Sequence, residues 1–293
     1  MALCCLLHGS TAAGSTSVLG SANHLTRPFP VTTQRDRHVR PNVRCFELPQ
    51  SSPSPMNRSP SDTMSLPSGT LKLHGWYKSS CSARVRIALA HKCIDFTPVY
   101  VSYDDRQHHG DEYAAMNPSR SVPTLEVVPP DGSNGLVRYI AQSVAALEYL
   151  EEAYPSSVPL LPPPADVFGR AEVRSLVQIV VSDVQPLTNT RVFGRVVPLG
   201  QDETAWGAVW HARGLKAYEE SIREGAGRYS VGDGVTMADV CLAPMIWNAF
   251  KWGLTLDEYP TVKRVYDGLM ELEAFREGHW SRQPDCPPEQ RSK

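Results

Sequence analysis

Four small polar residues, Ser79-Ser80-Cys81-Ser82, stand where the sequence predicts that a helix begins. They follow a predicted strand at residues 70–76 and precede an apolar segment with helical character at residues 83–92. The N–H groups of a first helical turn lack intrahelical acceptors and carry partial positive charge, so they attract anions. One hydroxyl is enough to cap a helix. The longer polar run therefore predicts an anion site, and the anion we expect is a thiolate.

The thiolate would come from a ligand, because Cys81 is the single cysteine of this run and the chain has no C-x-x-C pair. Dithiol exchange within the motif is thereby excluded. A free thiol with a pKa of about 8.5 is only slightly ionised at neutral pH. A serine hydroxyl that donates to the sulfur at a helix terminus raises the ionised fraction. A glutaredoxin-like reductase that acts through Cys81 alone remains an alternative.

Two further residue pairs lie at the starts of predicted elements. Val122-Pro123 precedes a strand and predicts a cis proline that leaves the backbone N–H and C=O of Val122 free to pair with an extended peptide ligand. Gln142-Ser143 opens a helix, where side chains and N–H groups suit a small-molecule carboxylate. The order of these pairs after the serine-cysteine run predicts a thioredoxin-like glutathione-binding domain.

The elements that position these residues form two predicted domains. The first, at residues 69–155, is α/β, and the second, at residues 165–285, is all-helical after a proline-dense linker. The predicted strands of the first domain cover residues 70–76, 96–101, 124–128 and 136–139, the last two paired as a hairpin through a turn at 131–135. Its predicted helices cover residues 83–92 and 143–153.

The second domain shows helical periodicity throughout. Its first apolar stripe predicts one helix through Val173, Leu176, Val177, Val180, Val184 and Leu187. A second long helix is predicted at residues 206–224, and another begins near Pro260. Between them, Thr236 and Asp239 have the spacing of a capping box, in which each side chain binds the backbone N–H of the other residue.

The composition is that of an ordinary globular protein. The 293 residues are 41% hydrophobic and 20% charged with a formal net charge of −2, which gives no electrostatic case for nucleic acid, and no apolar run is long enough for a membrane helix. Seven cysteines without paired spacing favour a reducing compartment. The histidines have no metal-ligand spacing, so we expect no metal site, and adjacent His108 and His109 are predicted to be solvated loop residues.

Residues 1–68 do not resemble a packed domain, because apolar periodicity is absent and proline and serine crowd residues 49–68. Up to Ser61 the segment has six arginines against two acidic residues. We expect a disordered extension and a cytoplasmic protein. An arginine-rich, acid-poor start also fits a mitochondrial transit segment, which remains the alternative.

Residues 70–287 resemble the zeta class of glutathione transferases, the maleylacetoacetate isomerases. The most specific match is the run of residues 79–89, and the capping box is shared by the whole transferase superfamily. The resemblance continues through Asn117-Pro118, Val122-Pro123-Thr124-Leu125, Gln142-Ser143, residues 148–152, Gln185-Pro186-Leu187, residues 231–233, residues 236–239 and residues 282–285. It implies the glutathione transferase fold and a homodimer that uses glutathione as cofactor.

The resemblance also implies the site residues. Ser79, Ser80 and Cys81 match the catalytic motif that holds and activates the glutathione sulfur. Positions matching the cofactor site further include Ser82, Ala83, Arg84, His109, Val122, Gln142, Ser143, Gln185, Asn189, Thr190 and Arg191. Arg84, Arg191 and Lys251 are the cations expected to hold the substrate. Ala83 stands where the family pattern usually has Trp. Lys251 stands where many members have Arg, and lysine lacks the bidentate fork of a guanidinium.

The implied reaction is the isomerisation of maleylacetoacetate to fumarylacetoacetate in phenylalanine and tyrosine breakdown. Addition of a thiolate turns a conjugated double bond into a single bond, which rotates before the thiolate leaves. The protein must supply the thiolate, hold a dianion and stabilise enolate charge. Two other functions stay open beside the reductase: a transferase acting on electrophiles or α-haloacids, and a non-catalytic dimerisation module of the same fold.

Overall fold

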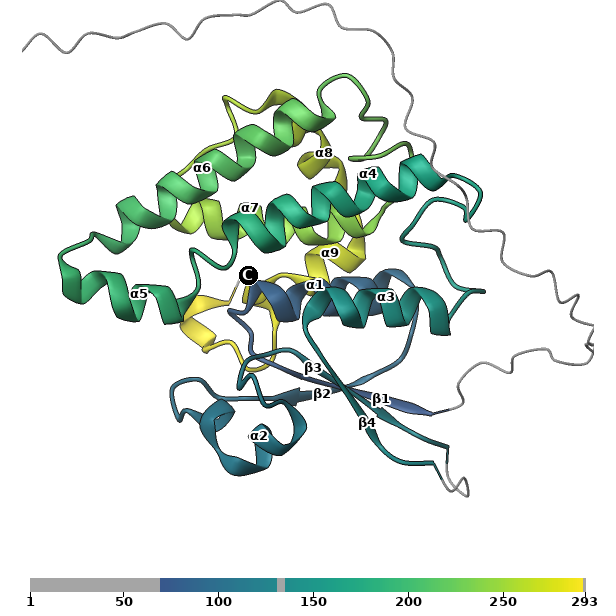
Figure 1. Cartoon of the computed structure of the whole chain (residues 1–293), viewed down its shortest axis with the longest axis vertical. Helices are drawn as coiled ribbons and strands as arrows, with labels where there is room; N and C mark the ends of the chain where they lie inside the picture. The colour runs from purple at the N-terminus through teal and green to yellow at the C-terminus, as the bar shows by residue number, and fades with distance from the viewer. Residues whose placement is uncertain (1–68, 131–134, 292–293) are drawn as a thin grey trace, which may run out of the picture. The chain divides into compact units, whose positions relative to one another are not determined.

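The computed structural model describes residues 69–130 and 135–291. The extension predicted at residues 1–68 and most of the turn predicted at 131–135 lie outside these ranges. Within them, an α/β part precedes a helical part, and Figure 1 shows helices α1 and α3 between the sheet and the helices of the second part. This order of elements agrees with the predicted fold class.

One sheet of four strands, in the order β2-β1-β3-β4, forms the base of the α/β part. The strands are β1 (Thr70–Gly75), β2 (Thr97–Tyr100), β3 (Thr124–Val128) and β4 (Arg138–Ala141). Strand β2 is parallel to β1, whereas β3 is antiparallel to both β1 and β4. The predicted hairpin is confirmed, but its second strand begins two residues later than predicted, because the ladder with β3 starts at the pair Val127–Arg138.

Three helices accompany this sheet: α1 (Ser80–His91), α2 (Asp111–Met116) and α3 (Ser143–Ala153). Every residue of α1 from Ser82 to Leu89 is buried, since this helix packs against α3, α7 and α9. A helix enclosed on all sides needs no polar face. The sequence predicts α3 with the observed bounds, whereas α2 carries too few apolar residues to be predicted.

The helical part contains α4 (Val167–Gln178), α5 (Thr190–Val196), α6 (Glu203–Ile222), α7 (Met237–Lys251), α8 (Pro260–Met270) and α9 (Glu273–Gly278). The single helix predicted through Leu187 is wrong, because α4 changes into a π-helical segment at Ile179–Val184. Helix α6 starts earlier than predicted, since the Asp202 side chain accepts from the N–H of Ala205 at 2.6 Å. None of the helices in the described ranges is long and apolar enough to cross a membrane.

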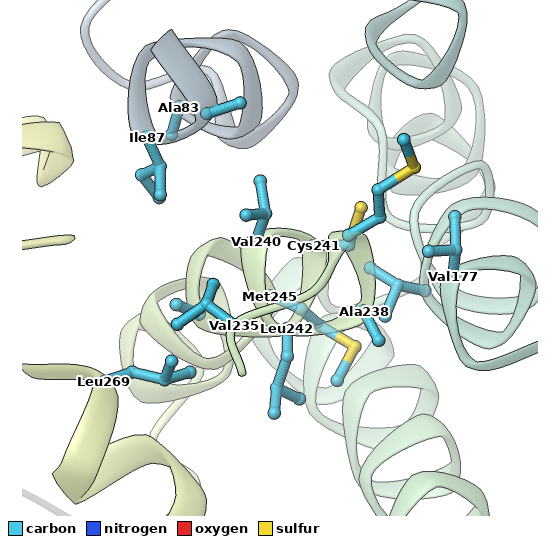
Figure 2. Close-up of a cluster of buried hydrophobic side chains, with 14 of the residues drawn as sticks. Ala83, Ile87, Val177, Val235, Ala238, Val240, Cys241, Leu242, Met245 and Leu269 are labelled. Carbon is cyan, nitrogen blue, oxygen red and sulfur yellow. The ribbon is translucent and has the colours of Figure 1, made fainter. Parts of the chain in front are cut away.

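Helix α7 lies at the centre of the core, and Figure 2 shows Val240 facing Ala83 and Ile87 of α1. All of its residues from Met237 to Trp247 are buried. The predicted capping box is confirmed: the buried carboxylate of Asp239 accepts from the N–H of Thr236 at 2.8 Å. The same carboxylate accepts from the N–H of Ser230 at 2.9 Å. This cap fixes the start of the helix whose other end, at Lys251, borders the candidate site.

Candidate active site

The serine-cysteine turn opens into a cleft of about 1420 Å³ between the α/β part and the helical part. Ser79 caps α1, because its hydroxyl oxygen accepts from the N–H of Ser82 at 3.1 Å. Ser80 and Cys81 come next, where backbone N–H groups have no helical acceptor. All three line the cleft, and the Ser80 hydroxyl has no protein partner among residues 69–130 and 135–291. The turn thus offers donors to an anion.

Ser82 and Ala83 differ from the expected binding role, because neither lines the cleft. Ser82 is fully buried, and its hydroxyl accepts from the N–H of Trp76 at 3.5 Å. Ala83 is 1% exposed and packs in the core beneath α1. Successive helical side chains point in different directions, so only the first residues of the run reach the cleft. The side chain of Ala83 therefore belongs to the core and not to the cleft wall.

Arg84 lines the cleft from the second turn of α1, although it is 2% exposed. Its Nη1 donates to the hydroxyl of Ser143 at 3.1 Å and lies 3.7 Å from the sulfur of Cys81. The structure brings together two predicted motifs here, since Ser143 is the first residue of α3. A buried guanidinium next to two helix starts makes this end of the cleft electropositive.

The predicted cis peptide bond between Val122 and Pro123 is confirmed, and both residues line the cleft. The N–H of Val122 is not free as expected, because it donates to the Tyr103 hydroxyl across 3.5 Å. This length marks a weak bond that a peptide carbonyl could replace. The backbone edge of Val122 that was predicted to pair with an extended ligand is thus present, and its N–H is bonded to the Tyr103 hydroxyl.

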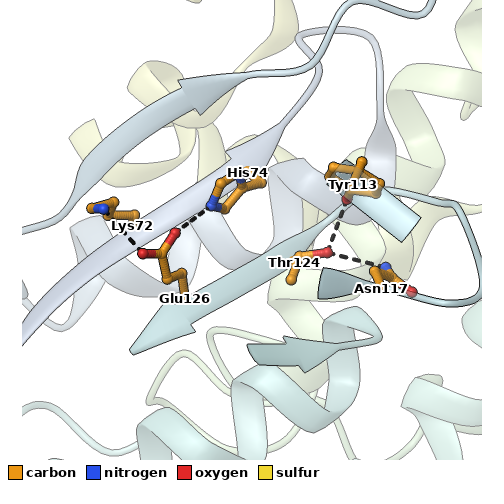
Figure 3. Close-up of polar contacts among 6 residues, drawn as sticks. All are labelled: Lys72, His74, Tyr113, Asn117, Thr124 and Glu126. Atoms are coloured by element: carbon orange, nitrogen blue, oxygen red, sulfur yellow. Dashed lines mark hydrogen bonds and ion pairs between the residues drawn. The ribbon is translucent and has the colours of Figure 1, made fainter. Parts of the chain in front are cut away.

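A buried polar cluster holds the loop before Pro123. The Asn117 side-chain amide donates to the carbonyl of Ser121 at 2.6 Å and to the Thr124 hydroxyl at 3.0 Å. The Tyr113 hydroxyl donates to the same carbonyl at 3.0 Å. Figure 3 shows Tyr113 and Asn117 converging on Thr124, beside the separate Lys72–Glu126–His74 contacts on the sheet. These contacts orient the Val122 backbone toward the cleft.

Gln142 precedes α3 with φ of 73°, a left-handed conformation that costs a non-glycine residue about 1–3 kcal/mol. Its side chain is exposed and lines the cleft, as does the buried Ser143. Strained backbone of this kind is concentrated at functional sites. The pair therefore lies where a carboxylate would meet both the helix start and the Arg84 guanidinium.

Histidines 108 and 109 both line the cleft, which the sequence predicted only for the second of them. The expectation of solvated loop residues is wrong for His108, which is 8% exposed and stacks on Tyr103 with ring centroids 3.8 Å apart. Tyr103 stacks in turn on Trp76 at 4.5 Å. Burial and the charges of His109 and Arg191 lower the pKa of His108. The neutral ring is therefore part of an aromatic wall.

The helical part supplies the opposite wall with Gln185, Asn189, Thr190 and Arg191. Asn189 caps α5, since its side chain accepts from the N–H of Arg191 at 3.0 Å. The Arg191 guanidinium donates to the carbonyls of Ser119 and Arg120 in the loop before Pro123. Arg191 thus ties the two walls together through Nη2 while its side chain also lines the cleft, and its role as a substrate cation stays a prediction.

Lys251, at the end of α7, is the predicted substrate cation without a hydrogen bond or ion pair in the described ranges. Its Nζ lies 4.1 Å from the ring centre of Trp252 and faces the cleft near Glu203 and Lys78. Burial and the charge of Lys78 lower the pKa of Lys251, while Glu203 raises it. The ammonium is therefore available to a carboxylate.

Several aromatic residues that line the cleft were not predicted from the sequence: Trp76, Tyr103, Trp247, Trp252, His279 and Trp280. Trp76 lies three residues before Ser79, and this closeness to the serine-cysteine run was the available signal. The others are brought in by tertiary packing from distant segments. Burial, together with Arg86 and Arg282, lowers the pKa of His279 to about 4, so its ring is neutral at pH 7.

The donor set fits glutathione. The tripeptide needs partners for a thiolate, for a peptide backbone and for a carboxylate, and one cleft presents the Ser80 turn, the Val122 backbone and the Gln142-Ser143 helix start. Arg84 contacts both the first and the third of these partners. The arrangement can hold a thiol as its anion beside a second, aromatic and cationic compartment.

Comparison with known families agrees with this geometry. Residues 78–153 match the model of the glutathione S-transferase N-terminal domain, and residues 210–273 match that of the C-terminal domain. A maleylacetoacetate isomerase from Emericella nidulans is 46% identical over 218 residues, which is 74% of this chain and 94% of the relative. One from Rattus norvegicus is 41% identical over 223 residues, or 75% and 97% of the two chains.

Solved structures give the same result. A maleylacetoacetate isomerase from Anaeromyxobacter dehalogenans with glutathione bound in its active site is 39% identical, with a TM-score of 0.66 over 75% of this chain and 99% of that one. A maleylpyruvate isomerase described as a zeta-class bacterial glutathione transferase is 34% identical, with a TM-score of 0.66 over 74% and 100%.

Proposed function

This chain belongs to the maleylacetoacetate isomerases, the zeta class of glutathione transferases, and from that premise we propose that its cleft converts maleylacetoacetate to fumarylacetoacetate with glutathione as cofactor. One observation carries the proposal: the Ser79–Cys81 turn, the Val122-Pro123 loop and the Gln142-Ser143 helix start all line the same cleft. The setting we propose is phenylalanine and tyrosine breakdown, as the resemblance implies.

Glutathione, when bound, supplies a thiolate that adds reversibly to the conjugated double bond and so permits rotation about it. The Ser80 hydroxyl is one group that donates to the sulfur, and the Ser79 hydroxyl keeps its own proton for the same purpose while its oxygen accepts the N–H of Ser82 as a cap. Gln142 and Ser143 hold the γ-glutamyl carboxylate, and Val122 holds the peptide backbone. Arg84 contributes positive charge that favours both anions.

Lys251 holds a substrate carboxylate in this account. Arg84 donates to Ser143 through Nη1, and Arg191 donates to two backbone carbonyls through Nη2, so each already has protein partners. The Lys251 ammonium, by contrast, borders the aromatic wall of the cleft. Lys78 lies on the same side of the cleft and adds positive charge there. A dianion is attracted to this side by both ammonium groups.

We propose a homodimer as the assembly. Exposed apolar side chains support it: Leu136, Val137 and Tyr139 stand at or beside β4, and Val167 and Phe168 at the start of α4. Neighbouring exposed apolar side chains, such as those beside β4, are a feature of association surfaces. Light scattering on the purified chain should give twice the mass of one chain, and a monomer mass at all concentrations would contradict the proposal.

We propose a cytoplasmic location, with mitochondrial import through residues 1–68 as the alternative. A fusion of residues 1–63 to a reporter protein separates the two. A diffuse cytosolic signal of the fusion is the expected result. Import of the fusion into mitochondria would establish the mitochondrial location instead.

Turnover of the cis substrate by the purified chain tests the reaction. Isomerisation should require glutathione and should not occur with S-methylglutathione, which has no thiol. Conversion of an α-haloacid or another electrophile without isomerisation would establish the transferase function instead. Turnover through a mixed disulfide between glutathione and Cys81 would establish the reductase function. Absence of all these activities would favour the non-catalytic dimerisation module.

A further inference from the structure

The loop that leads into the serine-cysteine turn is held by side chains outside the motif. Residues Trp76, Tyr77 and Lys78 follow β1 without regular structure, and the N–H of Ser79 donates to the carbonyl of Trp76 at 3.0 Å. The place of Ser79, and of the Ser80 hydroxyl after it, thus depends on how this short loop is fixed.

Arg86 fixes the loop from one side. This residue is 8% exposed, and its guanidinium donates to the carbonyls of Trp76 at 3.5 Å and of Tyr77 at 3.3 Å. It also donates to the carbonyl of Gly278, the last residue of α9, at 3.3 Å. The buried Arg86 side chain therefore connects the loop at residues 76–78 to the C-terminal segment, residues 278–291.

Asp285 fixes the same loop from the other side. Its carboxylate accepts from the N–H of Tyr77 at 2.9 Å, so both backbone polar groups of Tyr77 have side-chain partners. Burial raises the pKa of Asp285, while the Tyr77 N–H and the charge of Arg86 lower it. The charge of Asp285 in turn offsets part of the desolvation that lowers the pKa of Arg86 to about 10.

The C-terminal segment that carries Asp285 is itself tightly seated. A Cβ at Gly278 would lie 2.4 Å from Cγ1 of Ile87, so α9 approaches α1 more closely than any other residue at this position would permit. The same segment contributes His279, Trp280 and Gln290 to the cleft. Movement of this segment would therefore reach the loop and the cleft together.

We infer that Arg86 and Asp285 are positioning residues, which hold the Tyr77 backbone so that the serine-cysteine turn presents its donors to the glutathione sulfur. The inference rests on the proposed function of that turn. It adds a role for the C-terminal segment, whose Asp285 lies 208 residues from Tyr77 in the chain. Neither residue touches the reacting atoms in this role; both act through the loop.

The test compares Asp285→Ala, Asp285→Asn and Arg86→Lys with the wild type. Loss of a hydrogen bond to a charged group corresponds to about a 10- to 100-fold effect, so Asp285→Ala should lower kcat by about 10-fold or more. Its kcat–pH profile should also move its acidic limb to higher pH, because a displaced turn ionises the bound thiol less. Asp285→Asn keeps an oxygen for the Tyr77 N–H and should recover most of kcat.

The control for removing a charged side chain from the C-terminal segment is Arg282→Ala, since Arg282 lies in the same segment but pairs with Glu277 at the surface, 2.7 Å away. If Asp285→Ala does not fold, the inference is tested with Arg86→Lys. This variant keeps the positive charge and loses the guanidinium fork that bonds the carbonyls of Trp76 and Tyr77. A lower melting temperature with wild-type kcat and pH profile in these variants would overturn the inference. An inactive wild type would instead refute the proposed function.

Discussion

The Arg84 guanidinium donates to the Ser143 hydroxyl across 3.1 Å and thereby joins the starts of α1 and α3. Both helix starts belong to the candidate glutathione site, one for the sulfur and one for a carboxylate. The same guanidinium nitrogen lies 3.7 Å from the sulfur of Cys81. The distance between the two anion sites is therefore set by one buried side chain.

Arg84→Lys should raise the KM for glutathione by about 10-fold, because the lysine side chain is one bond shorter and its ammonium does not reach the position from which one guanidinium nitrogen contacts both Ser143 and Cys81. Steady-state kinetics with glutathione as the varied substrate measure this effect. Arg223→Lys is a suitable control, since Arg223 pairs with Glu220 at the exposed end of α6. Equal KM values for the two variants would show that the bridge to Ser143 is not needed.

The two serines of the turn should behave differently. Ser80→Ala should lower kcat by about 10- to 150-fold without changing the melting temperature, since its hydroxyl serves only the sulfur. Ser79→Ala should also cost about 0.5–2 kcal/mol of stability, because Ser79 caps α1. Kinetics and thermal melting of both variants separate the roles. Full activity of Ser80→Ala at saturating glutathione would remove it from the mechanism.

Lys251→Ala should raise the KM for maleylacetoacetate and leave the KM for glutathione unchanged, because the ammonium faces the aromatic side of the cleft. An exposed charge pair contributes up to about 1 kcal/mol, or about 5-fold, and Lys251→Arg should retain the affinity. Lys216→Ala, on the exposed face of α6, provides the control. A change in the glutathione KM alone would place Lys251 in the cofactor site.

Thr236→Ala should destabilise the protein by about 0.5–2 kcal/mol and leave turnover per folded molecule unchanged. The reason is the cap at the start of α7, where Thr236 and the buried Asp239 are hydrogen-bonded. Thr255→Ala is a matched control, because Thr255 bonds Asp257 at the surface. If both variants melt like the wild type, the cap contributes nothing; a loss of turnover at full stability would place this helix start in the active site.

His279 predicts a pH dependence of stability. Its folded pKa of about 4 lies below the usual value of about 6.5, so below that pH the unfolded chain binds a proton that the folded chain does not. The stability present above about pH 6.5 is therefore lost as pH falls toward 4. His279→Gln should lose less melting temperature between about pH 7 and pH 5 than the wild type. An equal loss would mean that other groups, such as buried His211, dominate.

The sequence predicted the elements with strong local signals. The Ser79–Ser82 run, the cis proline and the Thr236–Asp239 box each combine turn or capping chemistry with apolar periodicity, and the structure has them at the predicted positions. The π-helical segment at Ile179–Val184 was missed because its apolar spacing resembles that of an α-helix.

Side-chain contacts of tertiary origin could not be predicted. His108 was expected to be solvated, but a 3-10 turn places its ring on Tyr103. Arg191 was predicted as a substrate cation, but the donation of its Nη2 to backbone carbonyls about 70 residues earlier in the chain was not predicted. Ser82 and Ala83 were predicted to bind the cofactor because they belong to the serine-cysteine motif, but their side chains are buried in the core. Spacing in the chain determines none of these.

Titration of the sulfur of bound glutathione tests the central claim most directly, namely that the serine-cysteine turn stabilises a thiolate. The ultraviolet absorbance of the thiolate is followed against pH for glutathione bound to the wild type and to Ser80→Ala. We expect the pKa of the bound thiol to lie well below the free value of about 8.5 in the wild type and to return toward that value in Ser80→Ala. Titration at the free value in the wild type would contradict it.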